Sequence, residues 1–181
     1  MWSLEFFIRP MVKTLLVMRH AKSDWDAEYG QDHERPLNER GVHSARLMGR
    51  VLAEHGYTPD LVITSTAVRA SSTATLAKAA GEWSSGIVVD PNLYGSGVDA
   101  AIHVASKASD VDRLMLVGHQ PTWSNLVLKL TGERVEMKTA TVAVVEFVID
   151  HWSALPGMLG RLAAVFQPRD YIGTDFEAPA S

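Results

Sequence analysis

Short apolar runs alternate with segments of helical periodicity along most of the chain, and this alternation restricts the fold more than any other feature. The runs are continuous rather than alternating in polarity, which is typical of strands covered on both faces. Four of them come in this order: 14–18, 61–64, 87–89 and 114–118. Each is followed by apolar residues at helical spacing, so we expect each strand to be followed by a helix.

The predicted helices carry recognisable start and stop signals. Thr122 is placed to cap the last of them, and glycine follows the second and the fourth, where helices commonly end. The expected helical segments are 42–54, 70–80, 98–107 and 122–131.

Two further apolar runs, 141–149 and 161–166, follow each other without a helix between them. We expect this pair to form an antiparallel hairpin. The preceding alternation of strands and helices requires right-handed crossovers and parallel strands, with helices on both faces of the sheet. The predicted fold class is therefore α/β: a three-layer α/β/α arrangement with a mostly parallel central sheet and a C-terminal antiparallel edge hairpin.

The composition fits this fold and argues against several classes of protein. A chain of 181 residues with 46% hydrophobic residues is long enough for one domain with a sizeable core. A net charge of −4 argues against a nucleic-acid binder. We expect no membrane span, because no run approaches the roughly 20 apolar residues that one needs. The absence of cysteine removes thiol chemistry and fits a cytoplasmic protein.

The domain is expected to cover residues 14–170. Residues 1–13 are interpreted as an irregular extension rather than a secretory signal, because Glu5 comes early and no small-residue cleavage site follows. Met11 could equally be an alternative start. Residues 171–181 are polar and are predicted to form a loosely ordered tail.

Three of the predicted strands end beside histidine or arginine. The residues concerned, in chain order, are Arg19, His20, Arg69 and His119. A lone Arg–His pair at a strand end is usually a solvent-facing terminus, but here the pattern recurs. Because open α/β sheets bind ligands outside the carboxyl ends of their strands, we expect these four side chains to form one site.

Two imidazoles and two guanidinium groups at one sheet edge suit phosphoryl transfer. Guanidinium forks match phosphate oxygens and stay charged, while helix N-termini add N–H donors and a favourable dipole. A neutral imidazole is a competent nucleophile near pH 7, because its ordinary pKa is about 6.5. Attack on phosphorus would form a phosphohistidine that water later cleaves, with the cations stabilising the transition state.

Four segments carry a resemblance to a known family: LVMRHAKSDWD, RPLNERG, STAVRASSTA and LMLVGHQP. In this order they resemble the motifs of the histidine phosphatase superfamily, which also holds the phosphoglycerate mutases. The resemblance runs from about Thr14 to Asp170, and the short segments between motifs are similar to those of SixA-type phosphohistidine phosphatases. It implies a phosphoglycerate mutase-like fold and a phosphatase, that is, a hydrolase.

The resemblance also implies catalytic roles. His20 would be the nucleophile, and Arg19, Arg69 and His119 would complete the phosphate pocket. The reaction would pass through a covalent phosphohistidine on His20.

Two further residues are expected to contact substrate on the same basis. Arg35, in RPLNERG, matches a basic position of the SixA-type branch and would also face phosphate, although an arginine before Pro36 could simply be a loop residue. Ser23 stands where related enzymes have a small polar residue near the pocket.

The identity of the general acid stays open. Larger family members supply a Glu or Asp after the third strand, where this chain has Gly95 after a tyrosine and Asp99 further on. Asp24 and Asp26 are the remaining candidates, although either could be a solvated loop carboxylate. Because a phosphoramidate nitrogen leaves more easily than an alkoxide, a missing acid favours phosphohistidine or another activated phosphate as substrate.

The acidic stretch 24–34 shows neither HExxH nor calcium-loop spacing. We therefore expect no metal and no other cofactor.

Alternative functions remain open. The chain could be a small-molecule phosphomonoesterase of the same superfamily or a non-catalytic module that binds a phosphorylated partner, and a mutase is a weaker option. The expected partners are a phosphorylated protein or a small phosphorylated substrate, with no nucleic acid and no membrane. The oligomeric state is not indicated.

Overall fold

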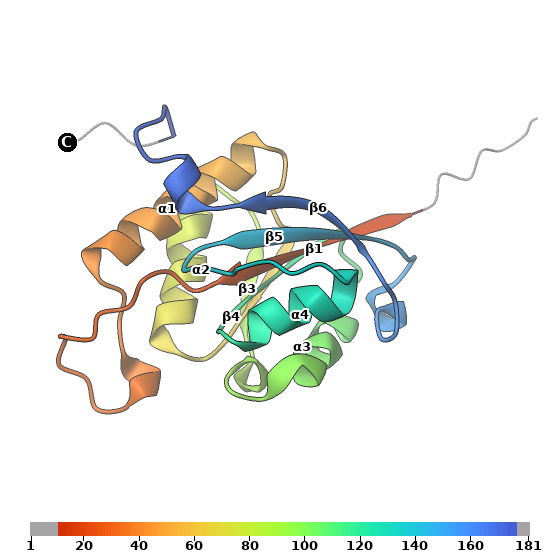
Figure 1. Ribbon diagram of the computed structural model, residues 1–181, viewed down its shortest axis with the longest axis horizontal. Coiled ribbons are helices and arrows are strands. Elements are labelled where there is room, and N and C mark those ends of the chain that lie inside the picture. The colour runs from red at the N-terminus through yellow and green to blue at the C-terminus, as the bar shows by residue number, and fades with distance from the viewer. Residues whose placement is uncertain (1–10, 177–181) are drawn as a thin grey trace, which may run out of the picture.

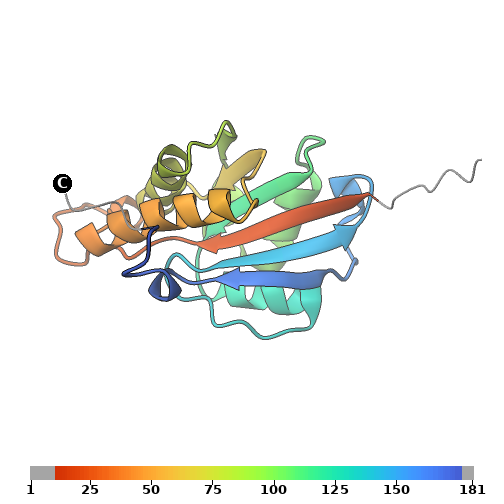
Figure 2. The same cartoon turned by 90° about the horizontal axis from the view of Figure 1, so that it is seen from above.

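The computed structural model describes residues 11–176 and has three layers (Figures 1 and 2). A six-stranded sheet lies in the middle. Helices α1 (Glu39–Glu54) and α2 (Val68–Ala80) cover one face, and α3 (Gly97–Ser106) and α4 (Thr122–Thr131) cover the other. The predicted α/β/α fold class is confirmed.

The sheet is parallel on one side and antiparallel on the other. Its strands lie in the order β3-β2-β4-β1-β5-β6; β1 pairs in parallel with β4, β4 with β2, and β2 with β3. The last two strands form the predicted hairpin, with β5 antiparallel to β1 and β6 antiparallel to β5. The strand bounds are β1 Val12–Arg19, β2 Leu61–Thr64, β3 Gly86–Val89, β4 Arg113–Gly118, β5 Val142–Val148 and β6 Arg161–Phe166.

Continuous apolar strands are explained by the two cores that they separate. Leu15 and Val17 of β1 pack with α3 and α4, whereas Leu16 and Met18 pack with α1 and α2. Side chains of a strand alternate between faces, so a strand buried on both faces needs apolar residues at every position.

The helix ends differ slightly from the prediction. Helix α4 begins at Thr122 itself, after Pro121, and no side chain caps it. Its last residue, Thr131, is followed by Gly132, whose φ of 76° is the left-handed conformation that glycine adopts without strain. Short 3₁₀ helices occupy the connections: η1 Asp32–Glu34, η2 Pro91–Leu93, η3 Trp152–Ala154 and η4 Pro168–Asp170.

Both ends of the described chain are more ordered than the sequence suggests. Strand β1 begins at Val12, and Lys13 is buried with ion pairs of 2.8 Å to Asp110 and 3.3 Å to Asp112. Tyr171 and Phe176 pack against the core cluster to which α1 and α2 contribute. Residues 171–176 are therefore not part of a loose tail, although the sequence predicts one from residue 171. The rest of the predicted tail, 177–181, and residues 1–10 of the predicted extension lie outside the described residues.

A membrane-spanning helix would have to be long and apolar, and none in the described part of the chain meets that requirement.

Candidate active site

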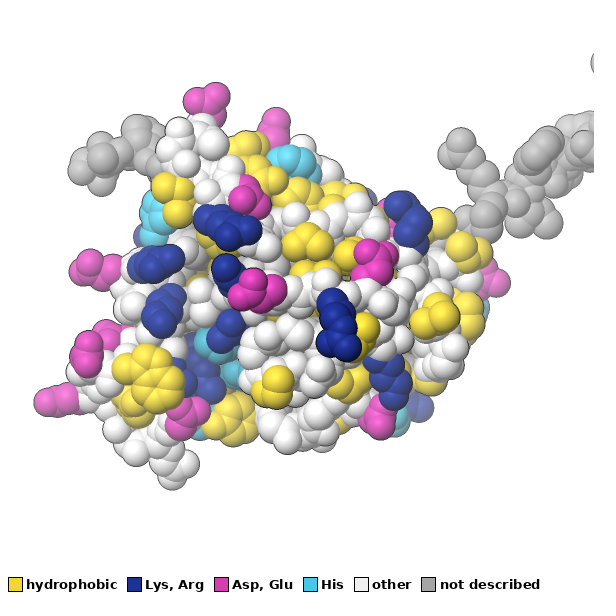
Figure 3. All heavy atoms as spheres, viewed as in Figure 1, with side chains coloured by type: hydrophobic (Ala, Val, Ile, Leu, Met, Phe, Trp, Pro, Cys, Tyr) yellow, Lys and Arg dark blue, Asp and Glu magenta, His cyan; other side chains and the backbone are white. Residues whose placement is uncertain are grey.

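The carboxyl ends of β1, β2 and β4 meet at one edge of the sheet, and six of the predicted site residues gather there. They line a pocket of about 220 Å³. On the face seen in Figure 3, histidine side chains lie among lysine and arginine side chains at the end of the molecule where β1 ends. The lining residues are Arg19, His20, Lys22, Ser23, Trp25, Arg35, Arg69, His119, Gln120 and Thr139.

His20 directly follows β1 and is held as a neutral imidazole. Its Nδ1 lies 2.7 Å from the carbonyl oxygen of Ala21, which can only accept, so Nδ1 carries the proton and Nε2 has a free lone pair. Burial is the main cause that lowers the pKa of His20 to about 3. The hydrogen bond to Ala21 acts in the opposite direction and raises the pKa. The nearby charges of His119, Arg69 and Arg19 act in the same direction as burial. An unprotonated Nε2 is what a nucleophile requires.

His119 follows β4, and its ring centroid lies 5.1 Å from that of His20. Its Nε2 is 2.8 Å from the hydroxyl oxygen of Ser65 at the end of β2. Burial first, and then Arg69, lower the pKa of His119 to about 4. Its buried Nδ1 has no hydrogen-bond partner among residues 11–176. The second imidazole is therefore also neutral near pH 7, with one ring nitrogen available to a ligand.

Arg19 and Arg69 present unused donors in the same pocket. Arg19 Nη1 donates to the Met137 carbonyl at 3.0 Å, and Arg69 Nη1 donates to the Asp32 carbonyl at 2.7 Å. Within the described part of the chain, neither Nε has a partner although both are buried. Buried unpaired N–H groups are costly, and an anion such as phosphate would satisfy them.

Arg35 also reaches the pocket and is only 5% exposed. It donates to the hydroxyl of Ser23, and its Nε and Nη2 lie 3.1 Å and 2.9 Å from Asp32 Oδ1. Ser23 itself is buried and forms an isolated bridge with Leu37. The structure thus brings together all six residues predicted to catalyse or to contact substrate.

Asp32 is a residue of the site that the sequence analysis does not single out, because it lies in the acidic stretch 24–34, which is considered only as a metal site. Its Oδ1 binds Arg35 and its Oδ2 lies 3.1 Å from Arg69 Nη2. Partial burial would raise the pKa of this carboxyl, but Arg35 and Arg69 together hold it below its usual range. The only sequence signal was its position three residues before Arg35.

Neither predicted acid candidate lines the pocket. Asp24 Oδ1 accepts from the backbone N–H of Asp26 at 2.9 Å, and the Asp26 side chain is exposed. Asp99 forms an ion pair of 2.6 Å with Lys129 at an exposed position. Asp32 contacts two arginines of the pocket, and its lowered pKa keeps it ionised rather than ready to donate a proton.

The donor set of the site does not suit a metal ion. Among residues 11–176 no three His, Cys, Asp or Glu side chains are grouped so that they could hold one. Three arginines at the pocket would also repel a cation.

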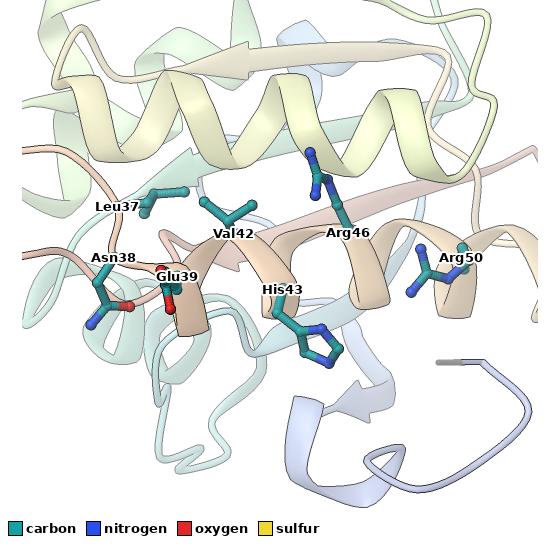
Figure 4. A pocket seen from close by; sticks show the side chains of 7 residues that line it. All are labelled: Leu37, Asn38, Glu39, Val42, His43, Arg46 and Arg50. Atoms are coloured by element: carbon teal, nitrogen blue, oxygen red, sulfur yellow. The ribbon is translucent and has the colours of Figure 1, made fainter. Parts of the chain in front are cut away.

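A larger hollow of about 460 Å³ lies along α1 but has a different character (Figure 4). Its lining comes from α1 and the residues just before it, and Leu37, Val42 and Arg46 point toward α2 in the close-up. It does not contain the two neighbouring imidazoles, so the smaller pocket is the candidate active site. The lining residues are Leu37, Asn38, Glu39, Val42, His43, Arg46 and Arg50.

Two imidazoles with lowered pKa values lie among three arginines at the carboxyl edge of a mostly parallel sheet, and this class of α/β site suits the binding of phosphoryl groups. Comparisons with known proteins agree. The model of the histidine phosphatase superfamily (branch 1) matches residues 15–96. An uncharacterized Mycobacterium tuberculosis protein is 32% identical over 166 residues, which cover 84% of this chain and all of that protein.

Solved structures of SixA proteins share the fold. SixA from Agrobacterium tumefaciens superposes with a TM-score of 0.74 at 26% identity, covering 86% of this chain and 98% of that one. SixA from Nakamurella multipartitia superposes with a TM-score of 0.74 at 28% identity, covering 87% and 96%. The chain therefore belongs to the histidine phosphatase superfamily, in its SixA-type branch. It is a phosphatase, and so a hydrolase.

Proposed function

We propose that this phosphatase works through a covalent phosphohistidine on His20 and that its substrate is phosphohistidine or another activated phosphate. The observation that carries the proposal is the 2.7 Å contact between His20 Nδ1 and the Ala21 carbonyl oxygen, which leaves Nε2 free to attack. The two SixA relatives carry the name phosphohistidine phosphatase, and this name supports the substrate class.

In the first step, the lone pair of His20 Nε2 attacks phosphorus. The P–N bond to Nε2 forms while the bond to the leaving group breaks, and the leaving group takes the electron pair and a proton from solvent. The guanidinium groups of Arg19, Arg35 and Arg69 lie around the pocket to stabilise charge on the three equatorial oxygens. In the second step, water attacks phosphorus, the P–N bond breaks, and His20 returns to its neutral form as inorganic phosphate leaves.

The substrate class follows from the carboxylates. An alkyl phosphomonoester releases an alkoxide, which needs a strong proton donor in the transition state. Asp24 and Asp26 do not line the pocket, and Asp32 is ionised by its two arginines. A phosphoramidate nitrogen is basic enough to be protonated by solvent, so phosphohistidine needs no such donor.

The test is the His20→Ala variant, assayed against phosphohistidine, a sugar phosphate and a nucleotide. We expect loss of turnover with phosphohistidine, and loss of the alkali-stable phosphoenzyme that quenched wild type should contain. His103→Ala is the matched control, because His103 is exposed on α3 and away from the pocket. Turnover of sugar phosphates by wild type as fast as phosphohistidine would contradict the substrate class, and turnover by His20→Ala would contradict the mechanism.

A further inference from the structure

Trp25 stands at the rim of the pocket with 64% of its surface exposed. Exposure of this size is unusual, because tryptophan is a highly buried residue on average. Trp83, Trp123 and Trp152 follow that rule in this chain and are buried. An exposed tryptophan that also lines a catalytic pocket calls for an explanation.

The Trp25 ring is held in place rather than free in solvent. The guanidinium carbon of Arg35 lies 3.6 Å from the ring centroid, in cation–π contact. Arg35 is buried and fixed by Ser23 and Asp32. One ring face therefore rests on a fixed partner. A ring held in this way loses little conformational entropy when a ligand covers its other face.

The backbone beside Trp25 is anchored as well. Asp24 N donates to the Pro36 carbonyl at 2.8 Å, and Ser23 forms its bridge with Leu37. These two contacts tie the chain just before Trp25 to the segment that carries Arg35. The position of the ring relative to the pocket is consequently set by the backbone as well as by stacking.

The pocket is small and open to solvent on one side. Its 220 Å³ is below the roughly 300 Å³ at which small-molecule sites begin. A phosphoryl group can enter, and whatever carries it must lie over the rim. There it meets the exposed ring of Trp25 and the exposed side chain of Lys22.

We propose that Trp25 is a recognition platform for a polypeptide that carries the phosphoryl group, an inference that rests on the proposed function. The free ring face covers the apolar part of the chain flanking the phosphorylated residue, and Lys22 attracts acidic side chains beside it. Tryptophan is among the residues that contribute most to protein–protein binding, because it buries a large area at a small entropy cost. Phosphoramidate carries no such flanking chain and therefore has no apolar part to lay on the ring.

The decisive measurement is the ratio of kcat/KM for a histidine-phosphorylated protein to kcat/KM for phosphoramidate. In Trp25→Ala we expect this ratio to fall about tenfold or more, mainly through KM for the protein, and in Trp25→Phe to recover in part. If Trp25 only shields Arg35 from water, both constants fall by the same factor and the ratio stays constant, which would overturn the proposal. Leu159→Ala, at a 74% exposed residue between β5 and β6, is the control and should leave the ratio unchanged.

A binding measurement separates this proposal from the proposed function. The His20→Ala variant is titrated with the same protein, phosphorylated and unphosphorylated, and with inorganic phosphate, while tryptophan fluorescence is recorded. We expect a blue shift with the phosphorylated protein that is lost in His20→Ala/Trp25→Ala. A blue shift that persists in the double variant, or no shift in His20→Ala with the phosphorylated protein, would overturn the proposed role of Trp25. Wild type that turns over neither substrate would overturn the proposed function, whatever the fluorescence shows.

Discussion

At the scale of single residues, Asp32 links the parts of the phosphate pocket. Its side chain and carbonyl together bind Arg35 and Arg69, which come from different segments of the chain. The Tyr94 hydroxyl also lies 3.4 Å from Asp32 Oδ2. Because the carboxylate fixes two guanidinium groups, it positions the cations that would meet the phosphoryl oxygens without being needed as a proton donor.

The Asp32→Asn variant tests this positioning role. The amide keeps the size of the side chain but loses the charge that orients the two arginines, so we expect kcat/KM for phosphohistidine to fall on the order of 10²-fold. The affinity for tungstate, a phosphate mimic, should fall with it, and circular dichroism should show an intact fold. An Asp32 variant with wild-type tungstate affinity and turnover would contradict the role. Asp26→Asn, at an exposed carboxylate outside the pocket, is the control.

At the scale of elements, α1 and α2 cross closely in the helical layer that covers one face of the sheet. A Cβ on Gly49 of α1 would lie only 2.0 Å from the carbonyl oxygen of Ala77 in α2. The Gly49 carbonyl in turn accepts from Trp83 Nε1 at 3.3 Å. Helix α2 carries Arg69 in its first turn, so the spacing of the two helices also bears on the position of this arginine.

Gly49→Ala should therefore be destabilising, although alanine is the better helix former. Overpacking costs about 1–3 kcal/mol of unfolding free energy, and a contact of 2.0 Å with backbone places the cost toward the upper end. This outweighs the gain of about 1 kcal/mol in helix propensity. Urea denaturation followed by circular dichroism measures the difference. Gly86→Ala is the matched control, because its nearest neighbour would be Leu61 Cδ1 at 3.8 Å. Equal midpoints for the two variants would argue against the close crossing.

At the scale of the whole molecule, the stability of the fold depends on pH, because two buried histidines of the site resist protonation. The pKa values of His20 and His119, about 3 and about 4, lie below the ordinary value of about 6.5 that they regain on unfolding. Below pH 6.5 the unfolded chain thus binds more protons than the folded one. Acidification consequently favours unfolding of the entire domain, although the cause lies in one pocket.

The free energy of unfolding should fall as the pH drops from about 6.5 toward 4, with a slope of up to about 1.4 kcal/mol per pH unit for each of the two histidines. Urea midpoints at pH 7 and pH 5 measure this effect above the range where most carboxylates titrate. The His20→Asn/His119→Asn variant has no such groups in the pocket and should lose most of the dependence. The same slope in wild type and variant would show that other groups are responsible.

The order and type of the elements can be predicted from the sequence, because hydrophobic periodicity is a local property that a few neighbouring residues express. The sequence also predicted that Arg19, His20, Arg69 and His119 would meet, since the carboxyl ends of parallel strands share one edge. All four lie in the pocket. These predictions needed only the sheet topology and no side-chain conformation.

The remaining contacts of the pocket come from residues that are distant in sequence, and no local pattern predicts them. Asp32 meets Arg69 from 37 positions away, and Ser65 meets His119 from 54. The stacking of Trp25 on Arg35 and the packing of the tail depend on loop conformations that no periodicity encodes. In segments without a repeating pattern, contacts with residues distant in sequence determine the backbone conformation. The contacts of Asp32, Trp25 and Tyr171 therefore could not be predicted from the sequence and were found only in the folded structure.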